Sequence, residues 1–555
     1  MAAPTRVLIL GGGFAALHTA RRLRRAIRAG TAEVTVVARN NFLYAHGFAA
    51  EMVTGRIAPG TILNPARRIF APARIHIAEI ESIDLEARRV VTSRHLDGVR
   101  YELEYDELVL ALGSAENLEA YPGLAEHAFK LKRYEDGFRL KNHLIEMLEL
   151  ADIESDPEER SRLLTFFVAG GGFSGTELAC ELADYVRLLT GREYPRIARH
   201  ECRIVIVHPG STLLPELYGS STERRSKSYP RLVDYAMRHA QRLGVEFMLE
   251  TKVVGATPNE VHLSNGSVVP TRTIISTVGT KAVDVLEALP LERDARGRVV
   301  VDENLRVVGR QDLWAGGDCA AVPHPKGGTC PPVALYAVAH GTHIGRNLSR
   351  TLAGGRTRPF RAGVIGQAVS IGRRAAVGDV KGVPVRGKIA WLGWRSIVFM
   401  NFPSWDRKLR LLADWSVWPL VGRDIVQMTS AQRPDYEVRH NVYQPGEVIA
   451  ERARPVRYVH VIVEGEVELV GRREGVEETV DTIGPGSHFG RKSLEQASAD
   501  VARAKSLVRT LALRAEEANR LQDVLLSTGR IVARTEMLPT IDLEALRRER
   551  ESSGS

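Results

Sequence analysis

Two similar glycine turns constrain the fold of this chain more than any other feature. The segment RVLILGGGFAA (6–16) reads as an apolar run, a triple-glycine turn and the start of a helix, and LLTFFVAGGGFSG (163–175) repeats that pattern. A continuous apolar run is typical of a buried parallel strand. Both turns fit G-x-G-x-x-G/A, and each unit continues into a further strand-like run, EVTVVARNN (33–41) and CRIVIVH (202–208). This order predicts an α/β chain with two Rossmann-like dinucleotide-binding domains.

Glycine at such turns has a chemical purpose. The backbone must turn tightly and approach a pyrophosphate closely, and the helix that follows offers free N–H groups and partial positive charge to that anion. Two units in one chain predict two dinucleotides bound face to face, a permanently held flavin and a visiting nicotinamide. The residues expected to contact them are Gly11, Gly12, Gly13, Phe14, Ala15, Arg39 and Asn40 in the first unit, and Gly170, Gly172, Phe173, Ser174, Gly175 and His208 in the second.

Three later segments match the remaining parts of a two-dinucleotide flavoprotein. ELVLALGS (107–114) and RTIISTVGT (272–280) match the strands that link its two domains. RVVGRQDLWAGGDCAAVP (306–323) matches the segment that returns to the first domain and holds the ribityl-pyrophosphate arm of the flavin. The cofactor-binding residues predicted from these segments are Ala111, Gly113, Gly279 and Asp318.

The bulk properties limit the class of protein. At 555 residues the chain is expected to form about three units, and 44% apolar with 26% charged residues is a globular composition. The net charge of +9 suits an anionic partner, whether nucleotide, nucleic acid or membrane surface. No apolar stretch approaches the roughly 18–20 residues that span a bilayer, and no signal peptide fits before the first strand. We therefore expect a cytoplasmic chain or one on the inner face of the cell membrane, without metal sites.

Residues 1–428 resemble the type II NADH dehydrogenases, single-subunit flavin enzymes that pass electrons from NADH to membrane quinone. The resemblance implies FAD, NADH, hydride transfer, a quinone or other electron acceptor, and a peripheral place on the membrane. It implies no nucleic-acid partner, and a homodimer is one candidate state. The segments that carry it beyond the glycine turns are RNNFLYAHGFAAEMVTG (39–55), YPGLAEHAFKLKRYEDGFRLKNHL (121–144), GDCAAVP (317–323) and VSIGRRAAVGDV (369–380).

The sequence departs from that family at several positions. The acidic residue that would bind a ribose hydroxyl after each second strand is replaced by Ala38 and His208. The segment HPGST (208–212) has no arginine for a 2′-phosphate, which favours NADH over NADPH. The two glutamines that the family places at the quinone pocket are Leu335 and Ala339 here. A related reductase with a soluble acceptor and a redox-sensing flavoprotein therefore stay open as alternatives.

Two features bear on catalysis. Pro331 and Pro332 are expected in the first turn of a helix whose positive end, at Ala334, faces the flavin ring. Glu177 follows the second glycine turn, where the family places a glutamate beside the site of ring stacking, so we predict a catalytic role. The alternative is a carboxylate that merely favours the first turn of a helix.

Cysteine chemistry is a rival, since sulfide:quinone reductases and disulfide reductases share the architecture but relay electrons through cysteine pairs. The CxxxxC expected after the first glycine turn is absent. Cys330 precedes the flavin-facing helix, whereas Cys180 belongs to the helix of the second unit. Buried inert thiols are the commoner role.

Residues 376–428 are predicted to associate with a membrane. Five of the six tryptophans fall between residues 391 and 418, interleaved with cations. Such a segment is typical of a helix that lies in a lipid headgroup layer. Arg395 and Lys408 interrupt its apolar runs, which are therefore too short to cross a bilayer. The alternative is an ordinary pair of core helices.

The last part of the chain changes to short alternating strands with Pro-Gly and Glu-Gly turns, and resembles a cyclic-nucleotide-binding β-roll. Where that fold has a glutamate that binds the ribose, this chain has Arg491. The position of the phosphate-binding arginine falls near Ser498, and the nearest basic residue is Arg503. These changes argue against cyclic AMP and favour a dimerisation or autoinhibitory module.

The predicted domains are 1–155 with 281–375 for FAD, 156–280 for NAD, 376–428 for the membrane, 429–530 for the β-roll with LRAEEANRLQDVLLSTG (513–529) as its closing helix, and 531–555 as a charged tail.

Overall fold

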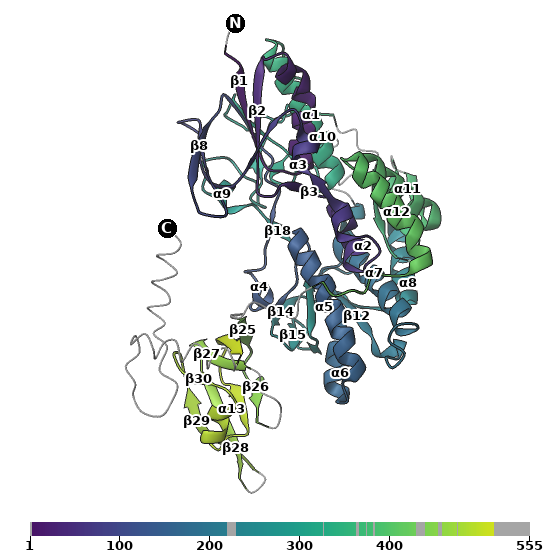
Figure 1. The fold of residues 1–555 in the computed structure, drawn as a ribbon, viewed down its shortest axis with the longest axis vertical. Helices are drawn as coiled ribbons and strands as arrows, with labels where there is room; N and C mark the ends of the chain where they lie inside the picture. Colours follow the sequence, from purple (N-terminus) through teal and green to yellow (C-terminus); the bar gives the residue numbers. More distant parts are fainter. Residues whose placement is uncertain are drawn as a thin grey trace.

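A computed structural model places two α/β lobes, a helix pair and a β-rich unit. The lobes are stacked, the helix pair covers one side, and the β-rich unit stands beside the lower lobe (Figure 1). The predicted closing helix, apart from its first two residues, and the charged tail lie outside the described residues. The structure describes residues 3–218, 229–325, 327–361, 366–372, 374–380, 383–428, 439–452, 458–473 and 476–514.

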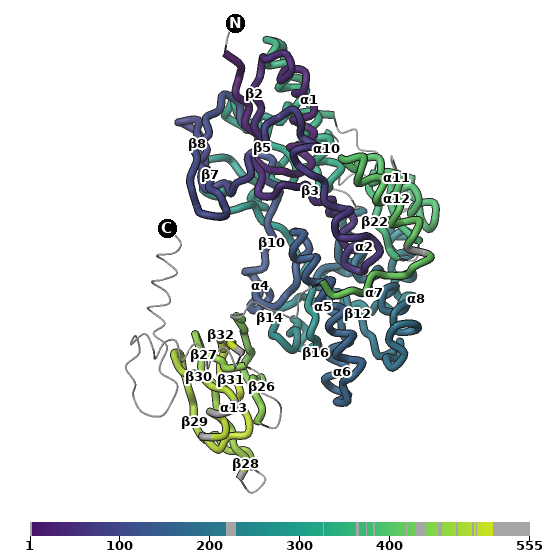
Figure 2. The backbone as a smooth tube through the Cα atoms, in the orientation of Figure 1, coloured from purple at the N-terminus to yellow at the C-terminus, as the bar shows by residue number. Residues whose placement is uncertain are grey.

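The upper lobe is built on a parallel sheet in the order β20-β9-β1-β2-β5. The first apolar run forms the central strand, and the return segment adds β20 beside β9, so early and late parts of the chain share this lobe (Figure 2). Helix α1 (Phe14–Arg28) packs against α10 (Ala334–Leu352). The strands are β1 (Thr5–Leu10), β2 (Ala32–Ala38), β5 (Arg74–Ile77), β9 (Glu107–Leu110) and β20 (Leu313–Ala315).

The α1–α10 contact needs glycine on α10. A Cβ built on Gly341 would lie 2.0 Å from the Ala15 carbonyl oxygen, and one on Gly345 would lie 2.7 Å from that of Thr19. The two helices therefore approach closely enough for the Thr19 hydroxyl to donate to the Gly341 carbonyl at 3.1 Å. This packing fixes the start of α10 next to the first glycine turn.

The lower lobe has a second parallel sheet in the order β13-β12-β11-β17. The second glycine turn joins β11 to α7 (Phe173–Thr190), as predicted. Helices α5 (Tyr134–Ile153), α6 (Pro157–Leu163) and α8 (Tyr229–Leu243) belong to this lobe (Figure 1). The strands are β11 (Thr165–Ala169), β12 (Arg203–Val207), β13 (Val245–Met248) and β17 (Thr273–Ser276).

A small antiparallel sheet leads into the helix pair. It is formed by β22 (Gly366–Ser370), β23 (Ala376–Val380) and β24 (Val383–Arg386), and it spans the predicted boundary at 375/376. Helices α11 (Gly387–Asn401) and α12 (Trp405–Val421) follow. In the part of the chain that the structure describes, no helix combines the length and apolarity needed to cross a membrane.

The C-terminal unit is a roll of two four-stranded antiparallel sheets around its own small core. One sheet has the order β25-β32-β27-β30 and the other β26-β31-β28-β29. The elements are β25 (Arg439–Tyr443), β26 (Val448–Glu451), β27 (Tyr458–Glu464), β28 (Val467–Arg473), β29 (Val476–Ile483), β30 (His488–Phe489), α13 (Arg491–Gln496), β31 (Val501–Ala504) and β32 (Val508–Arg514).

Candidate dinucleotide and acceptor site

The first glycine turn is an open cradle. Gly11 has a φ of +116°, and a Cβ there would lie 2.1 Å from the Ala111 carbonyl oxygen, so only glycine fits. Gly13 precedes α1, and a Cβ on it would meet no atom within 4 Å. The N-terminus of α1 therefore faces free space, as an anion-binding turn requires.

That space belongs to a cavity of about 930 Å³ between the two lobes. Most of the predicted site residues line it, although they come from both glycine turns, the return segment and α10. Those that line it are Gly12, Gly13, Phe14, Ala15, Arg39, Asn40, Ala111, Gly113, Phe173, Ser174, Glu177, Asp318 and Ala334. The structure thus brings these residues together, while their contacts with cofactors stay predictions.

The remaining predicted residues lie outside the lining. Gly11 and Gly170 shape the turns, and a Cβ on Gly175 would lie 1.9 Å from the Gly170 carbonyl oxygen. The His208 ring sits on the second turn, where its Nδ1 accepts from the Gly171 N–H at 3.2 Å. The two remaining predicted residues are Gly172, which is the N-cap of α7, and Gly279, whose neighbours Val278 and Thr280 line the cavity.

The turn that carries Asp318 is braced by residues that the sequence did not single out. The buried His340 ring accepts at Nδ1 from the Gly317 N–H at 3.2 Å, and burial lowers the pKa of His340 to about 3, so the ring stays neutral. Lys132 donates to the Ser114 hydroxyl, which donates to Asp318 at 3.4 Å. Burial lowers the pKa of Lys132, while Asp318 opposes that shift. No spacing pattern connects these residues, since they meet only through the fold.

This cavity fits a flavin dinucleotide. The start of α10 has no acidic residue in its first turn and no side-chain cap, so its free N–H groups are available to an anion. Together with the open α1 turn and Lys132 it makes the cavity wall favourable for pyrophosphate. One expectation was wrong: α10 begins at Ala334 with Val333 as N-cap, so Pro331 and Pro332 precede the helix instead of forming its first turn.

Glu177 lines the cavity near a buried cluster of charges that includes Glu51, Glu181 and Arg395. Burial raises the pKa of Glu177 well above its ordinary value, and Glu51 and Glu181 raise it further against the opposing effect of Arg395. The carboxyl group therefore keeps its proton to a higher pH than an exposed glutamate does. A buried acid with a raised pKa next to a cofactor cavity is suited to proton delivery.

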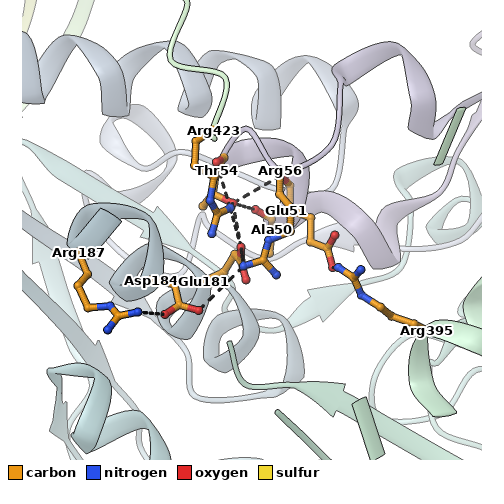
Figure 3. Close-up of polar contacts among 9 residues, drawn as sticks. All are labelled: Ala50, Glu51, Thr54, Arg56, Glu181, Asp184, Arg187, Arg395 and Arg423. Carbon is orange, nitrogen blue, oxygen red and sulfur yellow. Dashed lines mark hydrogen bonds and ion pairs between the residues drawn. The ribbon is translucent and has the colours of Figure 1, made fainter. Parts of the chain in front are cut away.

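The cluster itself joins three parts of the molecule. The Glu181 carboxylate of α7 pairs with Arg56 at 2.9 Å and with Arg423, which follows α12, at 2.8 Å. Glu51 of α2 (Ala49–Val53) pairs with Arg395 of α11 at 2.6 Å. These side chains are almost fully buried, and Figure 3 shows Arg56 and Arg423 reaching Glu181, and Arg395 reaching Glu51.

Arg395 corrects one sequence-based interpretation. It was placed among surface cations that divide an apolar run, but it points inward and is only 8% exposed. Its guanidinium lies between the rings of Trp391 and Trp415, at 4.3 Å from each centroid. The apolar period of α11 cannot reveal a buried arginine whose partner lies on another helix.

The outer face of the helix pair is strongly apolar. Its inner face packs Trp394, Phe402 and Leu411 against the core. One side of α11 also lines the cavity, through Trp394, Ile397 and Val398. The exposed apolar side chains of the pair are Ile389, which also lines the cavity, and Leu392, Met400, Trp405, Leu409, Leu412, Val417, Leu420 and Val421.

All four cysteines are free thiols. Burial raises the pKa of each, to about 12 for Cys330 and about 11 for Cys319. Since the thiolate is the reactive form, these residues are poorly placed for an electron relay.

Near the expected phosphate position of the β-roll, two arginines pair with carboxylates of the roll itself. Arg503 pairs with Glu477 at 2.9 Å, and Asp500, close to Ser498, pairs with Arg452 at 2.8 Å. The roll is docked on the lower lobe, where the Val442 N–H donates to His127 Nε2 at 3.0 Å.

Comparisons with known proteins agree with this architecture. Residues 5–341 match the pyridine nucleotide-disulphide oxidoreductase family, and residues 440–523 match the cyclic nucleotide-binding domain. The chain therefore belongs to the pyridine nucleotide-disulphide oxidoreductase family. The predicted α/β fold with two dinucleotide-binding domains and a C-terminal β-roll is confirmed.

The relatives confirm the resemblance to type II NADH dehydrogenases. The type II NADH:quinone oxidoreductase of Mycobacterium tuberculosis is 27% identical over 74% of this chain and 87% of its own length. The demethylphylloquinone reductase of Synechocystis is 28% identical over 75% of this chain and 96% of its own. The structure of NDH2 from Plasmodium falciparum in complex with NADH shares the fold, with a TM-score of 0.68 at 16% identity, covering 76% of this chain and 99% of that one.

Proposed function

We propose that this chain is an FAD-dependent oxidoreductase that takes hydride from NADH and passes the electrons to a membrane quinone. The observation that carries the proposal is that the cavity between the lobes extends from the dinucleotide turns to the helix pair. Its wall runs from the open α1 turn, past Asp318 and Glu177, to the inner side of α11, whose outer side is exposed and apolar. One chamber therefore connects a dinucleotide cradle to a surface suited to lipid. The names of the relatives agree with this assignment.

The chemistry that FAD supplies when bound is two-electron transfer from a nicotinamide to an acceptor. The protein contributes position and charge. The free start of α10 favours negative charge in the cavity, while Asp318, held by its braced turn, orients the sugar arm. Glu177 holds a proton beside the reacting groups. Leu335 and Trp394 exclude water from the chamber.

Rapid-mixing spectroscopy tests this proposal directly. NADH should bleach the flavin of purified protein rapidly, NADPH should do so more slowly, and a short-chain quinone should restore the absorbance.

The second candidate is a reductase with a soluble acceptor, favoured by Leu335 at the cavity wall where the family has glutamine. Bleaching that ferricyanide reverses but quinone does not would support that candidate. Very slow bleaching with a shape change in the β-roll would support a redox sensor.

We propose further that the helix pair rests in the headgroup layer on the inner face of the membrane. Leu420 and Trp405 of α12 are 82% and 76% exposed, and neither lines the cavity. A variant with both changed to glutamate should lose vesicle binding by about tenfold or more, because burial of an apolar side chain contributes about 1.5–3 kcal/mol. The matched control is Leu96→Glu, since Leu96 is 94% exposed elsewhere on the molecule. Unchanged co-sedimentation of the double variant would contradict the proposal.

A further inference from the structure

The second glycine turn differs from the first in that two of its N–H groups donate to side chains. The Phe173 N–H, at the start of α7, donates to Glu216 Oε1 at 3.1 Å. The Gly171 N–H donates to the His208 ring. At such a turn these backbone groups are the ones that a dinucleotide pyrophosphate would use.

The two turns serve as an internal comparison. A Cβ built on Gly13 of the first turn would meet no atom within 4 Å, whereas one built on Gly172 of the second would lie 2.4 Å from Glu216 Oε1. Both turns lead into long helices without an acidic residue in the first turn. The difference is therefore the carboxylate of Glu216, which stands where the anion would bind.

The backbone around Glu216 is anchored on both sides. The Leu214 N–H donates to the Gly171 carbonyl at 2.8 Å, and Gln367 donates to the Glu216 carbonyl at 3.2 Å. Leu213, Leu214 and Leu217 are fully buried. The segment is thus held against the turn, and the side chain of Glu216, which lines the cavity, is the part that is free to rotate.

We propose that Glu216 sets the dinucleotide affinity of the second site by occupying the place of the pyrophosphate. Its carboxylate satisfies the start of α7 when the site holds no dinucleotide. Binding requires the side chain to turn into the cavity, which breaks a charge-assisted hydrogen bond and places two anions near one another. This inference rests on the proposed function for the identity of the dinucleotide, and it adds the residue that controls its affinity.

The expected effect follows from the strength of that bond. A hydrogen bond to a charged group contributes enough for about a tenfold to hundredfold change in an equilibrium constant. Glu216→Ala should therefore bind ADP-ribose and NADH about tenfold or more tightly than the wild type. Glu216→Gln keeps the shape and loses the charge, so its gain should be smaller.

Isothermal titration of flavin-loaded full-length protein with ADP-ribose gives the affinity without any redox step. Steady-state kinetics should then show a lower KM for NADH with an unchanged kcat, because Glu216 acts on binding alone. Glu287→Gln removes the charge of an exposed carboxylate on α9 (Asp284–Glu287), and it should change neither quantity. Flavin content reports whether each variant is folded.

The outcomes separate the two proposals. Equal or weaker ADP-ribose binding in both Glu216 variants, or no binding to any protein, would overturn the inference. ADP-ribose binding that tightens in the variants, together with a flavin that NADH never bleaches, would retain the role of Glu216 and refute the proposed function.

Discussion

At the scale of single residues, two carboxyl groups one turn apart on α7 have pKa values shifted in opposite directions. Burial raises the pKa of Glu177. Burial alone would do the same to Glu181, but Arg56 and Arg423 together hold the pKa of Glu181 below its ordinary value. Because their pKa values shift in opposite directions, we propose that Glu181 acts as a structural anion and Glu177 as a proton donor.

Glu177→Gln should separate the two halves of the reaction. The amide keeps the shape but carries no transferable proton, so reoxidation by quinone should slow by about a hundredfold while reduction by NADH is unchanged. The wild-type reoxidation rate should fall as pH rises through the elevated pKa of Glu177, since the proton is present below it. The rate of the variant should not depend on pH.

The measurement is double-mixing absorbance spectroscopy across neutral and alkaline pH. Glu158→Gln is the control, because Glu158 is an exposed carboxylate on α6. Equal slowing of both half-reactions in Glu177→Gln would instead indicate a role in the binding of the rings.

At the scale of elements, the Glu51–Arg395 pair connects α2, which packs on α5 and α7 of the lower lobe, to α11. Both side chains are under 10% exposed, so removing one leaves the other charge buried and unpaired. Arg395→Met should lower the free energy of unfolding by about 3–5 kcal/mol, and Glu51→Gln added to it should recover most of that loss. Chemical denaturation of the two single variants and the double variant measures the coupling. Additive losses would show that the pair does not act as a unit.

The same pair shows how far the sequence could predict this site. The glycine turns and Asp318 were predictable because each depends on neighbours within a few residues and on a strand-turn-helix order that local patterns reveal. Glu51 and Arg395 lie 344 positions apart, and neither shows a pattern of its own. Glu216 was missed for a similar reason, since a carboxylate in a loop looks solvated until the fold places it on a helix start.

At the scale of the whole molecule, the β-roll is docked through two titratable groups. Glu447 of the roll accepts from the Asn259 side chain of the lower lobe at 3.5 Å, and burial raises the pKa of Glu447 to about 7. His127 of α4 (Leu124–His127) accepts from the Val442 N–H of β25, and burial lowers the pKa of His127 to about 4. An ion pair between Arg509 and Glu126 at 2.8 Å completes the contact.

These two groups should oppose one another as pH changes. The pKa of Glu447 is higher in the docked state than in the free roll. This group therefore favours docking below about pH 4.5, and that contribution is lost as the pH rises to about 7. The docked state holds the His127 proton less firmly, so this group disfavours docking at about pH 4 and ceases to do so by about pH 6.5. The shifts are similar in size and opposite in direction, so docking of the wild type should vary little between pH 5 and 6.5.

Variants that keep only one of the two titratable groups should show a pH dependence of β-roll docking that the wild type lacks. With Glu447→Gln only His127 titrates, so the β-roll should detach as pH falls below about 6.5. With His127→Gln only Glu447 titrates, and the roll should detach as pH rises from about 5 to 7. Small-angle X-ray scattering of the full chain measures this as an increase in the radius of gyration, in opposite pH directions for the two variants. A double variant serves as the control with no dependence. If both single variants follow the wild type at every pH, the docking is insensitive to these protons.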